Sequence, residues 1–345
     1  MRLSRLRPTP AVSAAAPIGI LGAGSWGTAL AILLAHNGQS VRLWSVDTHE
    51  LVPLLAEREN RQYLPGIRFP DTLVIEPQLE KLSAVVRDVL VVVPSHGFRA
   101  TLNQLAALKP KDLRLAWATK GFEHGTGKLL HQVAGEILGE QLPLAVLSGP
   151  TFAREVAAGM PTAVTVASND AEFAKDLAEN LHSSSFRAYT SDDLTGVEVG
   201  GAVKNIIAIG CGISDGLKFG ANARAALITR GLVEITRLGL KLGARAETFQ
   251  GLAGLGDLVL TCTDDQSRNR RMGLALAAGK AVKSIEHDIG QVVEGVYAAV
   301  AVHHLARRLG VDMPITEQIY GILHQGLAPR AAVETLMTRA LRSES

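Results

Sequence analysis

A single lysine, Lys204, interrupts an otherwise uncharged segment, GGAVKNIIAIGCGI at residues 200–213. On a helix with about 100° between successive residues, the valines and isoleucines of this segment share one broad face. Lys204 lies on the other side, where its neighbours are glycine, alanine and cysteine. Small residues around a long cationic side chain leave a hollow that can receive a ligand. The alternative is a lysine whose ammonium group reaches solvent, and the residues alone leave both interpretations open.

A second group of residues that can bind or react follows in GLAGLGDLVLTCTDDQSRNRRMG, residues 251–273. Ser267 is in a position to cap the helix that follows, which requires no ligand. Three arginines, beginning with Arg268, together with Asn269 at the positive end of a helix also make an anion site of phosphate size. Because the net charge of the chain is only +2, this cluster is a local exception, and it favours a small phosphorylated substrate.

A glycine-rich turn near the start of the chain has the pattern of a dinucleotide site. In IGILGAGSWG, Gly22, Gly24 and Gly27 lie between an apolar run and the start of an expected helix. Glycines here let the turn tighten and let the backbone approach a pyrophosphate, which lies at the positive end of the helix. We therefore predict that this segment binds NAD(H) or NADP(H).

Asp47 follows the glycine turn by about twenty residues, at the end of the apolar run VRLWSV. An acidic group there can hold the ribose 2′-hydroxyl of NAD and repels the 2′-phosphate of NADP. No arginine or lysine lies among residues 45–49 to offset that repulsion. The pattern favours NAD, with the alternative that Asp47 caps the helix expected for THELVPLL.

Other candidate ligands follow later apolar runs. Lys120 ends LRLAWATKG, a loop at residues 94–98 follows VLVVVPS, and Gly149 and Thr151 follow LAVLS. In an open α/β sheet, ligands collect outside the carboxyl ends of the strands, so these residues are expected near cofactor and substrate. The alternatives are a solvated lysine and an ordinary turn.

The elements that must position these residues fall into two parts. From Pro17 to about Thr190, short near-continuous apolar runs alternate with amphipathic ones, which is typical of a parallel sheet covered by helices. After that, the patterns are helical, and SDD at residues 191–193 offers turn and capping residues. We predict a flexible extension at residues 1–17, an α/β Rossmann-type dinucleotide-binding domain at 18–194 and an all-α substrate domain at 195–345.

Composition excludes several classes of protein. The 47% hydrophobic and 20% charged residues are ordinary for a globular chain, and the near-neutral charge does not favour nucleic acid as a partner. Two cysteines, without metal-ligand spacing, predict neither a disulfide framework nor a metal site and fit a reducing cytoplasm. No secretory signal or membrane span is expected, because the apolar stretches are too short or interrupted.

Taken together, the motifs closely resemble the bacterial NAD(P)-dependent glycerol-3-phosphate dehydrogenase family. The resemblance runs from about Ile18 to about Arg339, in the family's order. Its motifs are GAGSWGTALA, VVVPSH, WATKG, SGPTFARE, GVEVGGAVKNIIAIGCGISDG, GANARAALITRGLVEITRLG, GLAGLGDLVLTCT, SRNRR and VVEG.

The resemblance implies reversible reduction of dihydroxyacetone phosphate to sn-glycerol 3-phosphate with NADH or NADPH, which feeds glycerophospholipid synthesis, and a homodimer. It implies that Lys204 is the catalytic acid and base. Substrate contacts implied by the motifs are Lys120, Gly149, Thr151, Lys204, Asp257, Ser267, Arg268 and Asn269. Cofactor contacts, besides the glycine turn and Asp47, are Ser25, Trp26, Lys120, Ala153, Arg268, Val292 and Glu294. Val46 departs from the family pattern, because this position is often basic in relatives, and its apolar side chain weakens the case for NADP.

The chemistry of a ketone reduction fits such a lysine. As hydride adds to the carbon, negative charge grows on the oxygen, and a proton donor within hydrogen-bond reach speeds the step by about 10² to 10⁴. Lysine suits this task if an apolar setting or a nearby cation such as Lys120 lowers its pKa from about 10.4. Asp257 would oppose that shift while it orients the ammonium group.

Two alternatives remain. One is a different two-domain hydroxyacid-type or sugar-nucleotide dehydrogenase; oxidation of a sugar nucleotide to the acid requires a cysteine nucleophile, for which Cys262 is the plausible candidate. The other is a non-catalytic NAD-sensing protein, which needs no proton donor. Such a regulator usually carries a recognition element for its target, and the sequence has neither a basic helix-turn-helix nor a basic tail.

Overall fold

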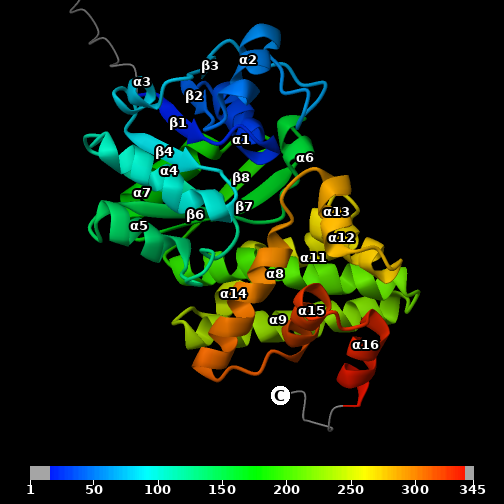
Figure 1. The fold of residues 1–345 in the computed structure, drawn as a ribbon. Coiled ribbons are helices and arrows are strands. Elements are labelled where there is room, and N and C mark those ends of the chain that lie inside the picture. Colours follow the sequence, from blue (N-terminus) through cyan, green and yellow to red (C-terminus); the bar gives the residue numbers. More distant parts are fainter. Residues whose placement is uncertain (1–15, 339–345) are drawn as a thin grey trace, which may run out of the picture.

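The computed structural model describes residues 16–338 and consists of a sheet-containing half above a helical half (Figure 1). All but the last two residues of the predicted extension at 1–17, and residues 339–345 of the predicted second domain, lie outside the described residues. The sheet half carries the glycine turn, and the helical half carries Lys204, so the line between them is where a shared site has to form.

Eight strands form one sheet in the order β3-β2-β1-β4-β5-β6-β7-β8. The predicted apolar runs are strands, and the sheet is parallel except that β7 runs antiparallel to β6. Strand β3 was not expected from the sequence, because it has only three residues and exposes its middle one. The strands are β1 (Ile18–Leu21), β2 (Val41–Trp44), β3 (Leu73–Ile75), β4 (Asp88–Val91), β5 (Arg114–Trp117), β6 (Leu144–Ser148), β7 (Thr162–Ser168) and β8 (Phe186–Ser191).

Helices cover both faces of this sheet, as the apolar character of its strands requires (Figure 1). One core joins the sheet to α1 (Ser25–His36), α2 (Thr48–Glu57), α6 (Ala153–Ala157) and α7 (Ala171–Leu181). The opposite core joins it to α3 (Leu79–Ser83), α4 (Phe98–Ala107) and α5 (Leu130–Leu138). A short turn of helix, η1 (Ser95–Gly97), connects β4 to α4. The fold is the expected Rossmann-type α/β arrangement followed by helices.

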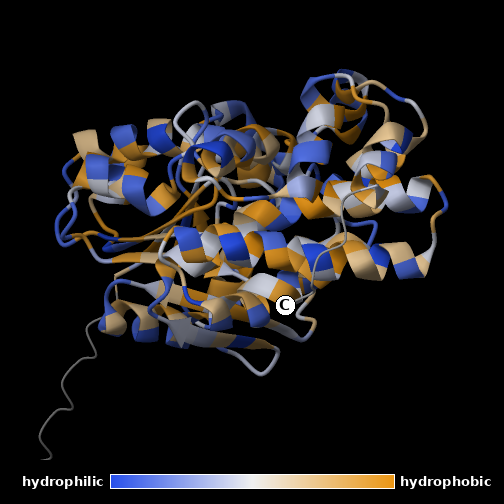
Figure 2. Cartoon of the chain, turned by 90° about the horizontal axis from the view of Figure 1, so that it is seen from below, coloured by the Kyte–Doolittle hydropathy of each residue, from blue (hydrophilic) through white to orange (hydrophobic). Residues whose placement is uncertain are grey.

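The helical half is built around α8 (Leu194–Gly216), which carries Lys204 and is buried along most of its length. It lies beside α9 (Ala221–Lys241) and also packs against β6 and β7 (Figure 1). The remaining helices are α10 (Ala246–Gln250), η2 (Leu252–Gly256), α11 (Asp257–Thr263), α12 (Arg268–Ala277), α13 (Val282–Ile289), α14 (Glu294–Leu309), α15 (Pro314–His324) and α16 (Pro329–Met337). Figure 2 shows hydrophilic and hydrophobic residues alternating along the outer helices, as expected where one face packs on a core.

By length and composition α8 is apolar enough to cross a membrane, but the 18-residue stretch that meets this criterion is entirely buried inside the structure. It begins where the SDD turn was expected to cap a helix: the Asp193 carboxylate accepts a hydrogen bond from the Gly196 amide at 2.8 Å. Because α8 also contacts the sheet, the division of the chain between residues 194 and 195 remains our proposal.

A buried carboxylate, Glu234 of α9, holds the start of α15. It accepts hydrogen bonds from the amides of Ile315 (2.6 Å) and Thr316 (3.1 Å) and from the Thr316 hydroxyl (2.9 Å). These bonds satisfy amides that a helix start leaves without partners. Burial is the largest influence on the carboxyl group and raises its pKa to about 7, while the hydrogen bonds oppose the rise. The folded protein therefore binds a proton here at pH values where the unfolded chain does not.

We predict that Glu234 contributes a gain of about 1 kcal/mol to the unfolding free energy when the pH is lowered from 8 to 6, because it takes up its proton only in the folded state over this range. Urea unfolding at both pH values measures the gain, and Glu234→Gln should remove it. Glu334→Gln, a change at an exposed position on α16, is the matched control. An undiminished gain in Glu234→Gln would contradict the assignment.

Candidate active site

Lys204 and Asp257 form a buried ion pair between α8 and α11. Their relative exposures are 5% and 1%, and the Lys204 ammonium group donates to Asp257 Oδ1 and, at 2.6 Å, to the Thr261 hydroxyl. The other carboxylate oxygen of Asp257 accepts from Lys120 Nζ at 2.7 Å. Lys120 follows β5, so one carboxylate joins the carboxyl end of the sheet to the central helix of the other half.

The small residues beside Lys204 bring neighbouring segments close. A Cβ on Gly200 would lie 2.5 Å from the carbonyl oxygen of Ala253, and one on Gly201 would lie 2.8 Å from Ser148 Oγ. We expected a hollow on this side of α8. At Gly200 and Gly201 there is none, because the backbone before Asp257 and the end of β6 fill the space. The glycines serve the site by admitting these segments.

The segment before Asp257, η2, is a turn of π-helix that runs directly into α11. Its wider winding is marked by the hydrogen bond from the Gly256 amide to the Gly251 carbonyl, five residues back, at 3.1 Å. π-helical turns within helices occur frequently at functional sites, because they displace one side chain from the regular helical position. Here the π-helical turn directly precedes Asp257, whose carboxylate bonds to both Lys204 and Lys120.

Charges and burial shift the pKa values of both buried partners. Burial, the largest influence, lowers the pKa of Lys204 to about 8; Lys120 lowers it further, and Asp257 opposes the shift. The pKa of Asp257 lies below its usual value because the two ammonium groups outweigh the effect of burial. Both influences expected to lower the pKa of the lysine are present, and so is the opposing carboxylate.

Two other predicted substrate contacts lie next to Lys120. Its ammonium group donates to the Gly149 carbonyl at 3.3 Å, and the Thr151 hydroxyl donates to the same oxygen at 3.2 Å. A Cβ at position 149 would lie 3.0 Å from the Ala163 carbonyl oxygen, so the turn after β6 passes close to β7. Lys120, Gly149 and Thr151 therefore share one end of the sheet with Asp257.

The start of α12 lies against α8 and α14. Ser267 caps α12 by accepting from the Arg270 amide at 3.2 Å, which is the ligand-free role considered for it. Asn269 accepts from the Gly295 amide and donates to the Asn205 side chain, each at 2.9 Å. This amide thus links three helices, one of them the helix that carries Lys204.

The arginines of this segment have separate roles. Arg270 forms ion pairs with Asp215 and, at 2.9 Å, with Asp265, so carboxylates of the protein already neutralise its guanidinium group. Arg268 donates to the Val292 carbonyl at 2.9 Å, and burial lowers its pKa. Arg271 is exposed. The three-arginine cluster expected from sequence is therefore divided, and Arg268 is its member that lies beside predicted cofactor residues.

Glu294, at the start of α14, connects the helical half to the loop after β4. Its carboxylate accepts from the Ser95 amide at 3.0 Å and from the Ser95 hydroxyl at 2.6 Å. The glycine at position 121 permits this approach, because a Cβ there would lie 3.1 Å from Glu294 Oε2. Glu294 therefore lies at the loop that follows β4, the strand beside β1 and its glycine turn.

The glycine turn has the shape that a dinucleotide requires. Gly22 has a φ of +121° and lies close to the Val92 carbonyl, and a Cβ on Gly27 would lie 1.9 Å from the Gly22 oxygen, so both are needed for tight packing. A Cβ on Gly24, in contrast, would meet no atom within 4 Å, which leaves open space over the start of α1. Trp26 Nε1 is buried without a hydrogen-bond partner among the described residues. These residues fit a bound pyrophosphate and cofactor.

Three further predicted cofactor residues lie at the starts of helices in the sheet half. Ser25 begins α1, and Ala153 begins α6, which packs against α1. Asp47 is exposed and caps α2 by accepting from the His49 amide at 2.9 Å. The capping alternative considered for Asp47 is therefore the role it has in the structure.

Several contacts of the site have no signal in the sequence. Thr261 bonds to Lys204, and Ser148 bonds to Asp257, because the fold brings distant segments together. Asn205 bonds to Asn269 because α12 packs against α8. Cys262, considered as a nucleophile, is fully buried; a hydrogen bond to Cys211 and burial raise its pKa. A thiolate is disfavoured there, which argues against a cysteine-dependent oxidation.

A sheet with a glycine-rich first turn, joined to an all-helical half with a buried lysine, defines the class of two-domain dinucleotide-binding dehydrogenase folds. Family models for the NAD-dependent glycerol-3-phosphate dehydrogenase N-terminus and C-terminus match residues 17–174 and 193–334. The chain belongs to this family.

Individual relatives cover almost the whole chain. Glycerol-3-phosphate dehydrogenase [NAD(P)+] of Vibrio cholerae is 57% identical, over 94% of this chain and 95% of the relative. The enzyme of the same name from Shewanella amazonensis is 58% identical, over 96% and 98%. The crystal structure of glycerol-3-phosphate dehydrogenase from Coxiella burnetii superposes with a TM-score of 0.91 at 52% identity, over 94% of this chain and 99% of that one.

The position of α12 relative to Lys204 depends on a close crossing with α8. A Cβ on Gly273 would lie 2.1 Å from the Ile209 carbonyl oxygen, and one on Gly212 would lie 2.1 Å from the Arg270 carbonyl oxygen. Backbone therefore meets backbone at this crossing. No side-chain movement can make room for an added methyl group.

We predict that Gly273→Ala lowers the free energy of unfolding by about 1 to 3 kcal/mol, the usual effect of overpacking a core, as measured by urea denaturation. Gly135→Ala is the matched control, because a Cβ there would have only an ordinary contact, 3.8 Å from Glu140 Cγ. This control should be neutral or stabilising, since alanine favours a helix over glycine by up to about 1 kcal/mol. Equal effects of the two variants would contradict the close-crossing explanation.

Proposed function

We propose that this protein catalyses the reversible NAD(P)H-dependent reduction of dihydroxyacetone phosphate to sn-glycerol 3-phosphate, with Lys204 as proton donor and acceptor. The observation that carries the proposal is a buried lysine with a pKa lowered to about 8, bonded to Asp257 where the ends of β5 and β6 meet the helical half. The high identity to relatives of that name supports it. We further propose that it acts in the cytoplasm as a homodimer and supplies glycerophospholipid synthesis.

The proton transfer follows from the chemistry of Lys204. When bound, the nicotinamide cofactor supplies the hydride. Lys204 donates its proton to the ketone oxygen as negative charge grows there, and takes the proton back from the hydroxyl in the reverse direction. Asp257 orients the ammonium group, and Lys120 lies on the far side of Asp257 as a second cation. A pKa of about 8 lets the same group act in both directions near neutral pH.

We assign the remaining substrate contacts to two segments. Gly149 and Thr151 lie beside Lys120 at the end of β6, and Ser267, Arg268 and Asn269 form the start of α12, where helix amides favour an anion. Ser267 and Asn269 are uncharged and bonded within the protein, whereas Arg268 is a cation whose Nη1 donates to a backbone carbonyl, so we assign the main phosphate attraction to Arg268. The cofactor contacts we propose are Gly22, Gly24, Ser25, Trp26, Gly27, Asp47, Lys120, Ala153, Arg268, Val292 and Glu294.

One assay separates this function from its alternatives. NADH absorbance is followed with and without dihydroxyacetone phosphate, and in parallel with NADPH. Substrate-dependent loss of absorbance supports the proposal. Cofactor binding without turnover would favour a non-catalytic NAD-sensing protein, and turnover only with a 2-oxo acid would favour another hydroxyacid-type dehydrogenase.

We predict that Lys204→Ala lowers kcat for reduction by about 10²- to 10⁴-fold, the usual contribution of a general acid. Steady-state kinetics with dihydroxyacetone phosphate measure the loss. Near-wild-type turnover would mean that Lys204 is not the proton donor.

The pH dependence of the wild-type enzyme is the companion measurement. Because the pKa of Lys204 is lowered to about 8, its proton is present below that pH and is lost above it. The kcat/KM for reduction should therefore fall as the pH rises through about 8, and that for oxidation should rise. Profiles that move together in both directions would contradict the role.

We predict that Arg268→Ala raises the KM for dihydroxyacetone phosphate at least about tenfold, because a charge-assisted bond to the phosphate is lost. Arg271→Ala is the matched control, since this arginine lies on the same helix and is exposed. If KM for the phosphorylated ketone is the same in Arg268→Ala as in wild type, the phosphate assignment is wrong.

A further inference from the structure

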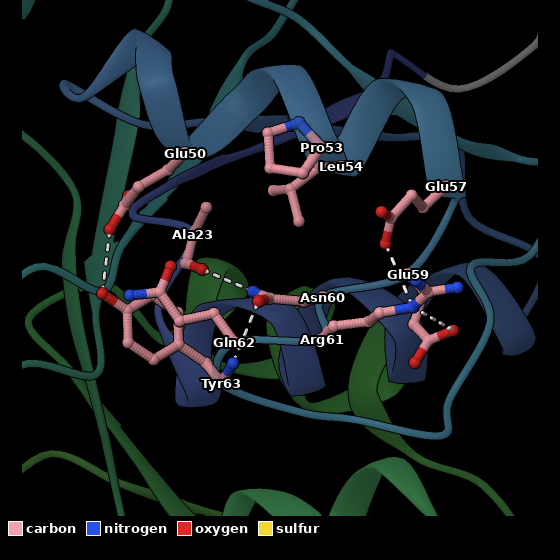
Figure 3. Close-up of a pocket in the computed structure, with 10 residues that line it drawn as sticks. All are labelled: Ala23, Glu50, Pro53, Leu54, Glu57, Glu59, Asn60, Arg61, Gln62 and Tyr63. Atoms are coloured by element: carbon pink, nitrogen blue, oxygen red, sulfur yellow. Dashed lines mark hydrogen bonds and ion pairs between the residues drawn. The ribbon is translucent and has the colours of Figure 1, made fainter.

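A small pocket adjoins the glycine turn on the side of α2 (Figure 3). It has a volume of about 200 Å³ and lies between α2 and the segment that leads from this helix towards β3. Its lining includes Ala23, the residue between Gly22 and Gly24, so it opens beside the backbone that fits the cofactor pyrophosphate. The pocket also lies near the carboxyl end of β2, where a Rossmann-type fold receives the ribose of the adenosine half.

One carboxylate of this pocket, Glu50, is held in place from two sides. Glu50 Oε2 accepts from the Ser45 hydroxyl at 2.7 Å, and Oε1 accepts from the Tyr63 hydroxyl at 3.0 Å. Figure 3 shows Glu50 and Tyr63 pointing toward each other beside Ala23. Ser45 directly follows β2, so these bonds fix the carboxylate at the end of that strand although Glu50 itself belongs to α2.

Tyr63 is itself held in position. The segment that carries it is anchored by Asn60, a buried residue whose side-chain amide donates to the Ala23 carbonyl and to the Thr28 hydroxyl, both at 2.8 Å. Asn60 Oδ1 accepts from the Tyr63 amide at 3.1 Å. The glycine turn, Tyr63 and the Glu50 carboxylate therefore form one hydrogen-bonded unit.

Asp47, the acid expected from sequence to meet the ribose, has a different environment. Its carboxylate is exposed and accepts from the His49 amide of its own helix. Of these two acids after β2, Glu50 is the one that lines the pocket beside Ala23.

Among the described residues that line it, the pocket offers no free cation to a phosphate. Its arginine, Arg61, pairs with Glu57 at 3.1 Å and lies 3.7 Å from Glu59, so two carboxylates share its charge. With Glu50, the lining is acidic overall. A 2′-phosphate placed here would meet unbalanced negative charge, whereas a 2′-hydroxyl can donate a hydrogen bond to a carboxylate.

We propose that Glu50, positioned by Ser45 and Tyr63, makes this protein select NADH over NADPH by accepting the ribose 2′-hydroxyl and repelling a 2′-phosphate. The inference rests on the proposed NAD(P)H-dependent function and assigns its cofactor selectivity to a residue other than Asp47. Glu50 acts on binding of the adenosine half, so its effect belongs in cofactor affinity, not in the proton transfer at Lys204.

The test is direct binding of NADH and of NADPH, measured by titration calorimetry on wild type and Glu50→Gln. Wild type should bind NADH more tightly. Glu50→Gln keeps hydrogen-bonding groups near Ser45 and Tyr63 but removes the charge, so the Kd for NADPH should fall about tenfold or more, while the Kd for NADH changes no more than about threefold. Tyr63→Phe, which removes one anchor and leaves the charge, should reduce the selectivity by a smaller factor.

Two variants act as controls. Glu57→Gln removes a carboxylate of the same pocket that pairs with Arg61 and has no bond to Ser45 or Tyr63, so its ratio of NADH to NADPH affinity should change less than that of Glu50→Gln. Asp47→Asn tests the competing assignment. If the ratio moves in Asp47→Asn but not in Glu50→Gln, or if wild type binds both cofactors equally, the inference is overturned.

Failure of the inference and failure of the proposed function are distinguishable. Binding of neither cofactor to wild type would contradict the function and the inference together. Binding of both with an unchanged ratio in Glu50→Gln would contradict the inference alone. Circular dichroism of each variant establishes that it is folded, and Tyr63→Phe provides the test if Glu50→Gln is not.

Discussion

The Asp257 carboxylate, buried between the ammonium groups of Lys204 and Lys120, is the interaction on which the rest of the site depends. Removing these groups from water is costly unless they are paired, and one carboxylate with two oxygens satisfies both lysines. The pairing also joins α8 and α11 to the end of β5, which makes the two halves of the molecule meet at the reactive group. The predicted substrate contacts Gly149 and Thr151 lie on the same edge of the sheet as Lys120 because β5 and β6 are parallel and both end there.

Glycines make this arrangement possible by close backbone approach. Gly200 and Gly201 admit the segments that carry Asp257 and Ser148, and Gly212 and Gly273 let α8 and α12 cross in contact. A chain of side-chain bonds then continues outward: Asn205 next to Lys204, Asn269 on α12, and the start of α14, whose Glu294 reaches Ser95. The lysine, the anion-binding segment and the loop beside the cofactor turn are therefore positioned relative to one another by packing and hydrogen bonds within the protein.

Much of the fold could be predicted from sequence because buried parallel strands appear as short, nearly continuous apolar runs. Strand β3 was missed since three residues with one exposed carry too little signal, and the reversed direction of β7 leaves no mark in its composition. At the site, residue types and order made Lys204 and Lys120 candidates but left a solvated lysine open for each, and the family resemblance added the site role of Asp257. The sequence could not distinguish small residues that leave space from small residues that admit a neighbour, and it could not show that Asp47 is a helix cap while Glu50, one turn later, is held facing the glycine turn.

The charge balance around Asp257 connects stability to chemistry. When all three groups are charged, two ammonium groups share one carboxylate, and the cluster carries an unbalanced positive charge around the buried side chains of Lys204 and Asp257. Such an excess can be relieved by the loss of one proton, which is why burial and Lys120 together lower the pKa of Lys204. It can also be relieved by negative charge growing on a substrate oxygen, and passing the proton to that oxygen leaves a neutral amine beside a neutral hydroxyl. The neighbouring thiol of Cys262 is not a competing acid, because Cys211 and burial raise its pKa. The same burial that makes the cluster costly therefore makes Lys204 release its proton more easily than an ordinary lysine does.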